Sequence, residues 1–240
     1  MFKKFVYALI ATVSLLCLAC CPPHIGAPQT VSNQILTSTI ALVLPGSPPT
    51  VFCSAVWIGP KLIVTVNHCI AGAAREQEIP IDLVVMHFQL LGDKKTVYDA
   101  NVITRIPSHD LALLEYIGNN IITHPYVELA DKITIGEPIA IVGHPAKLMW
   151  TYMVGVVAQV REAYSDFDVE DDDKELLRPP FIQVSAPIWF GNSGGGAFNA
   201  RGELIGIASF LMKVPNTGFF IPASEIRAML VGQYLRKARI

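Results

Sequence analysis

The chain is organised around Gly191-Asn192-Ser193-Gly194-Gly195-Gly196, a stretch that follows an apolar run and precedes the strand-like Ala197-Phe198-Asn199. A serine flanked by glycines favours a tight turn with few side chains, in which backbone N–H groups converge while the hydroxyl stays exposed. Such a turn can form an oxyanion hole, the set of donors that binds negative charge during acyl transfer. The same residues also fit a flexible glycine-rich loop or a phosphate-binding loop, so the choice depends on the rest of the chain.

Length and composition limit both the fold and the partners. The chain has 240 residues, of which 52% are hydrophobic, and it carries a formal net charge of −2. This length suits one compact all-β double barrel or two small domains, with enough apolar residues for a sizeable core. Nucleic acid is not an expected partner, because there is no excess of positive charge.

The first segment, residues 1–21, has the features of a secretion signal. Lys3 and Lys4 precede an apolar run over residues 5–18, which two cysteines and two prolines close. A short positive stretch followed by such a run is typical of exported proteins. We therefore predict that residues 1–21 direct export.

The end of this segment, Leu18-Ala19-Cys20-Cys21, resembles a bacterial lipobox, in which a small residue precedes the cysteine that becomes lipidated. If Cys21 carries the lipid, Cys20 occupies the position of the small residue; if Cys20 carries it, Cys17 replaces the usual leucine. We expect membrane attachment through this lipid, with a cleaved ordinary signal or an uncleaved anchor as alternatives. All three place the body of the protein outside the cytoplasm, in the cell envelope or at the cell surface.

Cysteine usage agrees with export. Three of the five cysteines lie in the signal segment, which leaves Cys53 and Cys69 as the pair in the folded part. Two cysteines in an exported domain are expected to form a disulfide, and closing a loop of that size stabilises by about 3 kcal/mol. The alternative is two separate buried thiols.

The remainder of the chain follows a pattern of short β-type runs. Residues 22–34 contain Pro, Gln, Ser and Asn without periodicity, so we predict a tether there. Turn signals then separate six runs, which predict a first barrel over about 35–118: Ile40–Leu44, Val51–Ile58, Leu62–Val66, Leu83–Phe88, Val97–Ile106 and Leu111–Ile117.

A second series of six runs follows a weakly patterned crossover over residues 119–132. These runs predict a second barrel within about 133–240: Pro138–Val142, Tyr152–Val160, Phe181–Val184, Gly195–Asn199, Leu204–Ser209 and Gly218–Ile221. Apolar residues at helical spacing predict a C-terminal helix over Ala223–Arg239. The fold class is thus all-β, with two six-stranded antiparallel barrels and a C-terminal α-helix.

Two further residues suggest acid–base chemistry. His68 follows the buried strand Leu62–Val66 and precedes Cys69, so the predicted bridge would fix its position, as a general base requires. Asp110 opens an apolar strand, where an inward carboxylate needs a partner such as an imidazole N–H. Ordinary structural roles are the alternative for both, since the chain has other histidines and other turn carboxylates: His24, His87, His109, His124, His144, Asp93, Asp99 and Asp131.

Three stretches together resemble the catalytic motifs of chymotrypsin-fold serine proteases, in the chain order His, Asp, Ser of that family. They are Thr65-Val66-Asn67-His68-Cys69, Asp110-Leu111-Ala112-Leu113-Leu114 and Gly191-Asn192-Ser193-Gly194-Gly195. The likeness is closest to the HtrA-like branch of trypsin-like peptidases, because Gly202-Glu203-Leu204-Ile205-Gly206-Ile207 and Gly218-Phe219-Phe220-Ile221-Pro222 also resemble it. It extends from about residue 35 to the end, and residues 35–240 would form the protease domain.

The resemblance implies a serine endopeptidase acting on protein or peptide substrates, without cofactor or metal. Ser193 would attack the peptide carbonyl, His68 would take its proton, and Asp110 would hold the imidazole. The backbone N–H groups of Gly191 and Ser193 would form the oxyanion hole. The alternative is a catalytically silent binding module on the same fold, which the retention of all three side chains disfavours.

Departures from the family pattern carry their own predictions. Asn192 stands where trypsin-like zymogens have an aspartate that captures a newly freed N-terminus, so we expect no activation by N-terminal cleavage. The chain also ends after its predicted helix, so we expect no PDZ domain.

Substrate-binding residues follow from the same resemblance. Trp189, Phe190 and Gly218 belong to the uncharged stretches that would form the specificity pocket, which favours an apolar side chain before the scissile bond. Ser209 would support the aspartate or bind the substrate backbone. An acidic run over residues 166–175 predicts a solvated loop; calcium binding is the alternative, although its spacing follows no known loop pattern.

Overall fold

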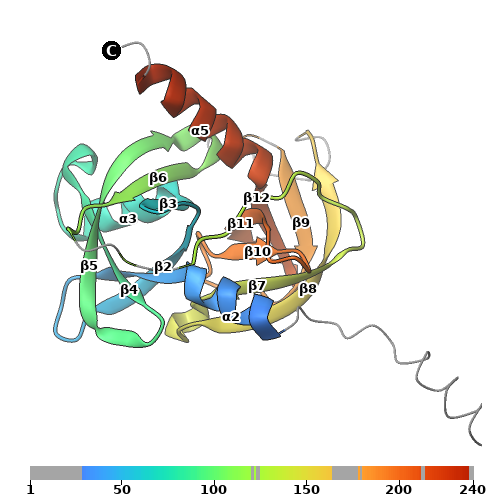
Figure 1. The fold of residues 1–240 in the computed structure, drawn as a ribbon, viewed down its shortest axis with the longest axis horizontal. Coiled ribbons are helices and arrows are strands. Elements are labelled where there is room, and N and C mark those ends of the chain that lie inside the picture. Colours follow the sequence, from blue (N-terminus) through green and yellow to red (C-terminus); the bar gives the residue numbers. More distant parts are fainter. Residues whose placement is uncertain are drawn as a thin grey trace, which may run out of the picture.

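The structure is a computed structural model that describes residues 29–119, 122, 125–163, 178, 180–211 and 214–237. In this part of the chain, two closed barrels of six antiparallel strands lie side by side (Figure 1), which confirms the predicted fold class. The predicted signal with Cys20 and Cys21, and the acidic run over 166–175, lie outside the described residues. None of the described helices is long and apolar enough to cross a membrane.

The first barrel joins six strands in the spatial order β1-β2-β3-β6-β5-β4, and pairing of β1 with β4 closes it. Its aromatic core is built around Trp57, whose ring contacts those of Phe88 and Tyr116 edge to face at 5.9 and 6.1 Å. The strands are β1 (Thr39–Leu44), β2 (Thr50–Trp57), β3 (Leu62–Val66), β4 (Val85–Leu90), β5 (Asp93–Ile106) and β6 (Leu111–Tyr116).

The second barrel has the order β10-β11-β12-β9-β8-β7, closed by pairing of β10 with β7. Its strands approach closely at Gly206, where an added Cβ would lie 2.5 Å from the Ile221 carbonyl oxygen. The strands are β7 (Pro138–Gly143), β8 (Thr151–Arg161), β9 (Phe181–Ser185), β10 (Gly196–Phe198), β11 (Leu204–Leu211) and β12 (Thr217–Pro222).

Helix α2 (Gln29–Ser38) begins inside the stretch predicted to be a tether. Ile35 is fully buried, Val31 packs beside it one turn earlier, and the Ser38 hydroxyl donates to the Pro125 carbonyl at 2.8 Å. Residues 29–34 therefore form the first turns of a packed helix, because apolar residues four apart share one helix face. The tether prediction overlooked this short periodic pattern.

Helix α3 (Asn67–Glu76) follows β3 directly and was not predicted, although its alanine content favours helix. It carries Cys69, which forms a disulfide with Cys53 of β2, as predicted. Short 3-10 turns make up the remaining irregular elements: η2 (Ile81–Leu83), η3 (Pro107–His109) and η4 (Pro145–Lys147). The fourth predicted strand starts at Val85 and not at Leu83, because Leu83 is the last residue of η2.

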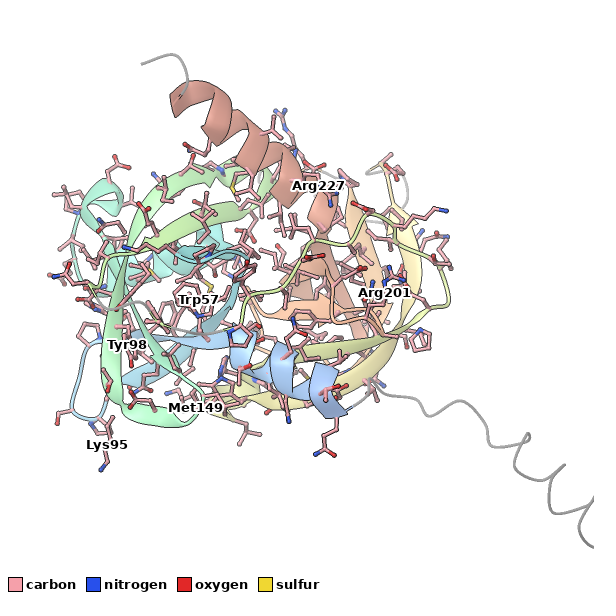
Figure 2. The ribbon with its side chains drawn as sticks, viewed as in Figure 1. Trp57, Lys95, Tyr98, Met149, Arg201 and Arg227 are labelled. Carbon is pink, nitrogen blue, oxygen red and sulfur yellow. A yellow bond between two sulfur atoms is a disulfide. The ribbon has the colours of Figure 1, made fainter. Side chains whose placement is uncertain are left out.

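The two barrels are joined by packing and by several hydrogen bonds across their boundary. The indole N–H of Trp150, in the segment before β8, donates to the Thr39 carbonyl of β1 at 2.9 Å. Met149, labelled in Figure 2, packs with Trp150 against Val43 and Val51 of the first barrel. The predicted C-terminal helix, α5 (Ala223–Lys237), leaves the second barrel and extends toward β6 of the first (Figure 1).

Replacing Ile35 tests whether α2 is part of the folded domain. Because Ile35 is fully buried, Ile35→Ala should lower the free energy of unfolding by about 2–5 kcal/mol, measured by urea denaturation. Ile135→Ala makes the same change at a site that is 56% exposed, and its effect should stay within about 0.5 kcal/mol. Equal effects of the two variants would contradict the docking of α2.

Removing the disulfide should also destabilise the domain. Cys53 and Cys69 are separated by 16 positions, so the variant Cys53→Ala/Cys69→Ala should lose about 3 kcal/mol of unfolding free energy. Reductant should lower the urea midpoint of the wild type in the same way and leave that of the double variant unchanged. A wild-type midpoint that does not respond to full reduction would contradict the contribution assigned to the bridge.

Candidate active site

The register of the first barrel brings His68 and Asp110 together. Strands β3 and β6 are antiparallel, with Val66 opposite Leu111, so the residues after β3 and before β6 are neighbours. The backbone N–H of Asn67 donates to the Asp110 carbonyl at 3.0 Å and continues this pairing beyond the strands. The imidazole and the carboxylate, 42 positions apart in the sequence, therefore meet at one end of the barrel.

The Asp110 carboxylate accepts three hydrogen bonds. Its Oδ2 lies 2.8 Å from His68 Nδ1 and accepts from the Ser209 hydroxyl at 2.6 Å, while its Oδ1 accepts from the His68 backbone N–H at 2.8 Å. The residue is only 3% exposed, so the carboxylate depends on these donors in place of water. An ionised carboxylate only accepts, so it fixes the proton on Nδ1 and leaves Nε2 of a neutral His68 as the basic atom.

The Ser193 turn belongs to the second barrel but is attached to the first. Ser54 of β2 donates its backbone N–H to the Ser193 carbonyl at 2.8 Å. Gly194 has φ +81°, and a Cβ there would lie 2.1 Å from the Ser54 carbonyl oxygen. Only glycine fits this turn, because the approach of the two barrels leaves no space for a side chain.

One cavity contains both His68 and Ser193. Its volume is about 360 Å³, and its other lining residues are Ile188, Trp189, Phe190, Ala208, Ser209 and Phe210. Within the described residues the two side chains are not hydrogen-bonded to each other; catalytic hydrogen bonds often tighten only in complexes with substrate. The cavity thus presents a hydroxyl and an imidazole on one surface that is otherwise largely apolar.

Backbone geometry orients the N–H of Gly191. The Phe190 carbonyl accepts a hydrogen bond from the Ala146 N–H at 2.8 Å. In a trans peptide the C=O and N–H point in opposite directions, so the N–H of Gly191 points away from Ala146. Gly191 has φ +96°, and a Cβ would lie 2.3 Å from the His144 carbonyl oxygen. Among the described residues, the N–H groups of Gly191 and Ser193 have no backbone acceptor.

The predicted substrate-binding residues differ in their positions. Trp189 and Phe190 line the cavity, with 56% and 70% of their surfaces exposed. Their rings contact each other edge to face, with the ring centres 5.6 Å apart. Ser209 lines the cavity too, with its hydroxyl bonded to Asp110. Gly218 is not one of the cavity's lining residues; instead it makes room for Ile188, since a Cβ there would lie 2.5 Å from that side chain.

The described part of the chain contains no group of side chains suited to bind a metal ion. The atoms of Cys53, His68 and Cys69 lie within 4.8 Å of one another and form the one group of three possible ligands found there. Both sulfurs take part in the disulfide, so the group offers a single imidazole. A zinc site needs at least three protein ligands from thiolates, imidazoles or carboxylates.

Two buried residues near the Ser193 turn, His144 and Ser54, were not predicted to belong to the site. His144 is fully buried, and its Nδ1 lies 2.7 Å from the Ser54 hydroxyl, which contacts the Gly191 carbonyl at 2.8 Å. Burial lowers the pKa of His144 to about 3. The contact between these two residues could not be predicted from local sequence, because they meet only when the barrels pack together. Asn192 is also fully buried, with no partner for its amide among the described residues.

Comparisons with known proteins agree with this arrangement. The family model for the trypsin-like peptidase domain matches residues 53–207, a span that includes His68, Asp110 and Ser193. The periplasmic serine endoprotease DegP of Salmonella typhimurium is 29% identical over 169 residues, which cover 69% of this chain and 31% of DegP. Serine protease HTRA1 of Xenopus tropicalis is 27% identical over 143 residues, covering 60% and 30% of the two chains.

The chain spans about a third of the length of these curated relatives. In fold it is similar to the crystal structure of the serine endoprotease from Yersinia pestis, with a TM-score of 0.65 and 18% identity over 91% of this chain and 69% of that one. The family model covers well over half of the sequence and all three chemistry-bearing motifs. The chain therefore belongs to the trypsin-like peptidase domain family, with relatives among the HtrA and DegP serine proteases.

Proposed function

We propose that this chain is an exported serine endopeptidase that cleaves peptide bonds through Ser193, His68 and Asp110. One observation carries the proposal: His68, held at Nδ1 by a buried carboxylate, lines the same cavity as Ser193. A base in a fixed tautomer beside a hydroxyl is what nucleophilic acyl transfer requires.

The reaction proceeds in two halves. Ser193 Oγ attacks the substrate carbonyl carbon while Nε2 of His68 takes the hydroxyl proton. The N–H groups of Gly191 and Ser193 bind the oxyanion, and Asp110 stabilises the imidazolium without taking its proton. His68 then protonates the leaving amine, and an acyl-enzyme remains. Water, activated by the same imidazole, hydrolyses this ester and restores Ser193.

Maturation by N-terminal cleavage is not part of this proposal. In trypsin-like zymogens an aspartate before the nucleophile pairs with a freed amino group. Asn192 is buried and uncharged at this position, so it supplies no anion for a terminal ammonium group. The turn would reach its working geometry by folding alone.

The primary specificity is proposed to be apolar. Ile188, Ala208 and Phe210 line the cavity beside Ser193, and its lining within the described part of the chain includes no aspartate or glutamate. A lysine or arginine side chain would lose its hydration there without gaining a counter-charge. An apolar side chain before the scissile bond would gain free energy by leaving water.

Export is supported by three observations: the N-terminal signal pattern, the Cys53–Cys69 disulfide and the similarity to DegP, a periplasmic serine endoprotease. We further propose that Cys20 or Cys21 carries a lipid that attaches the protein to a membrane. When cells are given a radioactive fatty acid, the wild type should be labelled and Cys20→Ser/Cys21→Ser should not. A wild type without label would exclude the lipid.

Active-site labelling tests the proposed nucleophile. A fluorescent fluorophosphonate should label the wild type and not Ser193→Ala, and cleavage of an unfolded protein substrate should fall by at least about 10³-fold. Ser185→Ala, which removes an exposed hydroxyl from β9, is the matched control and should keep both signals. A folded wild type that is neither labelled nor active would instead favour the silent binding module.

A peptide library tests the proposed specificity. Cleavage should follow apolar residues, and Ile188→Ala should enlarge the pocket, so that kcat/KM for phenylalanine rises about 10-fold relative to valine. Ile135→Ala, at an exposed position, should leave this ratio unchanged. Strict cleavage after lysine or arginine would rule out an apolar pocket.

A further inference from the structure

Ser54 connects the first barrel to both proposed oxyanion donors. Its backbone N–H donates to the Ser193 carbonyl at 2.8 Å, and its Oγ lies 2.8 Å from the Gly191 carbonyl oxygen. The residue is fully buried in β2, so neither contact competes with water. One residue of the first barrel therefore holds the backbone on each side of Asn192.

The direction of the hydrogen bonds follows from counting protons. The Ser54 hydroxyl has one proton, and it lies between the Gly191 carbonyl oxygen, which only accepts, and Nδ1 of His144 at 2.7 Å. The hydroxyl proton must go to Gly191, so His144 must donate from Nδ1. Nε2 then carries no proton, and in the described residues this buried atom has no partner.

His144 is therefore a neutral donor and not a titrating base at neutral pH. A second proton on Nε2 would create a buried cation without an acceptor, and burial lowers the pKa of His144 to about 3. Its ring also rests edge to face against Trp150, with the ring centres 5.2 Å apart. The two hydrogen bonds run in one direction, from His144 to Ser54 to Gly191, and each polarises the next.

The backbone at Gly191 needs the hydrogen bond from Ser54, because few steric restraints limit the backbone dihedral angles of glycine. Its φ of +96° is accessible at low cost only to glycine, which also means that neighbouring conformations are close in energy. The peptide before it is held by the bond from Ala146 to the Phe190 carbonyl, and the peptide after it by Ser54. Both restraints come from outside the turn.

We propose that His144 and Ser54 are positioning residues for the oxyanion hole: through the Gly191 carbonyl they keep the Gly191 N–H directed at the reacting oxygen. This inference rests on the proposed function, and it assigns roles to two residues outside the catalytic motifs. A donor misplaced by about 1 Å can cost about 100-fold in rate, so the restraint acts on kcat and not on substrate affinity.

Four variants test the proposal. His144→Ala and Ser54→Ala should each lower kcat by about 10- to 100-fold with KM within about 2-fold of the wild type. In His144→Asn the amide Nδ2 occupies the place of Nδ1 and donates to Ser54, so most of the activity should return. The double variant His144→Ala/Ser54→Ala should resemble Ser54→Ala, because both residues act through one carbonyl. His87→Ala, which removes only an exposed hydrogen bond to Asp99, is the control.

A peptidyl boronate provides a readout that a purely structural role would not change. Its tetrahedral adduct with serine places an oxygen in the oxyanion hole, so its Ki should rise in step with the fall in kcat for His144→Ala and Ser54→Ala. His144→Asn and His87→Ala should bind it nearly as tightly as the wild type. Thermal unfolding of each variant checks that it is folded. If His144→Ala does not fold, Ser54→Ala still tests the proposal, because it removes only one oxygen atom.

The outcomes separate the two proposals. A wild type without activity or fluorophosphonate labelling would overturn the proposed function and this inference with it. An active wild type, with unchanged kcat and boronate Ki in folded Ser54→Ala, would overturn this inference alone. Additive losses in the double variant, or a rise in KM at constant kcat, would also overturn it.

Discussion

The burial of the Asp110 carboxylate is the constraint on which the rest of the site depends. A carboxylate removed from water must be compensated by nearby donors, and the three that surround Asp110 come from both barrels. The His68 ring and backbone N–H belong to the first barrel, whereas the Ser209 hydroxyl belongs to the second. The compensation of this charge is thus complete only when the two barrels have packed against each other.

Close packing, at the boundary for Gly194 and within the second barrel for Gly191, determines which residues the Ser193 turn accepts. Gly191 and Gly194 both have positive φ, and at each of them a Cβ would overlap a carbonyl oxygen that lies outside the turn. Trp150, Ser54 and the α2 helix add polar and apolar contacts across the boundary. The glycines therefore reflect close packing of the backbones as well as the flexibility of the turn.

Much of this arrangement could be predicted from local sequence. Each of the twelve predicted β runs overlaps a strand of the structure, because alternating or continuous apolar residues bounded by turn residues are a strong local signal. Asp110 was recognised because it opens an apolar strand, and His68 because it follows one. The contact of Ser54 with His144 was not predicted, since it joins segments 90 positions apart. Helix α2 was overlooked because its apolar face is only two turns long.

The division of the site between the barrels has a consequence for how the molecule responds to stress. The first barrel supplies the imidazole and the carboxylate, the second supplies the hydroxyl and the N–H groups of the turn, and buried apolar residues of both barrels form one continuous cluster. A small hinge-like opening at the boundary between the barrels would leave every strand paired while moving His68 away from Ser193. Any such opening would show as a change in the distance between His68 and Ser193 and not as a loss of β-structure, so spectroscopy of the backbone alone would not detect it.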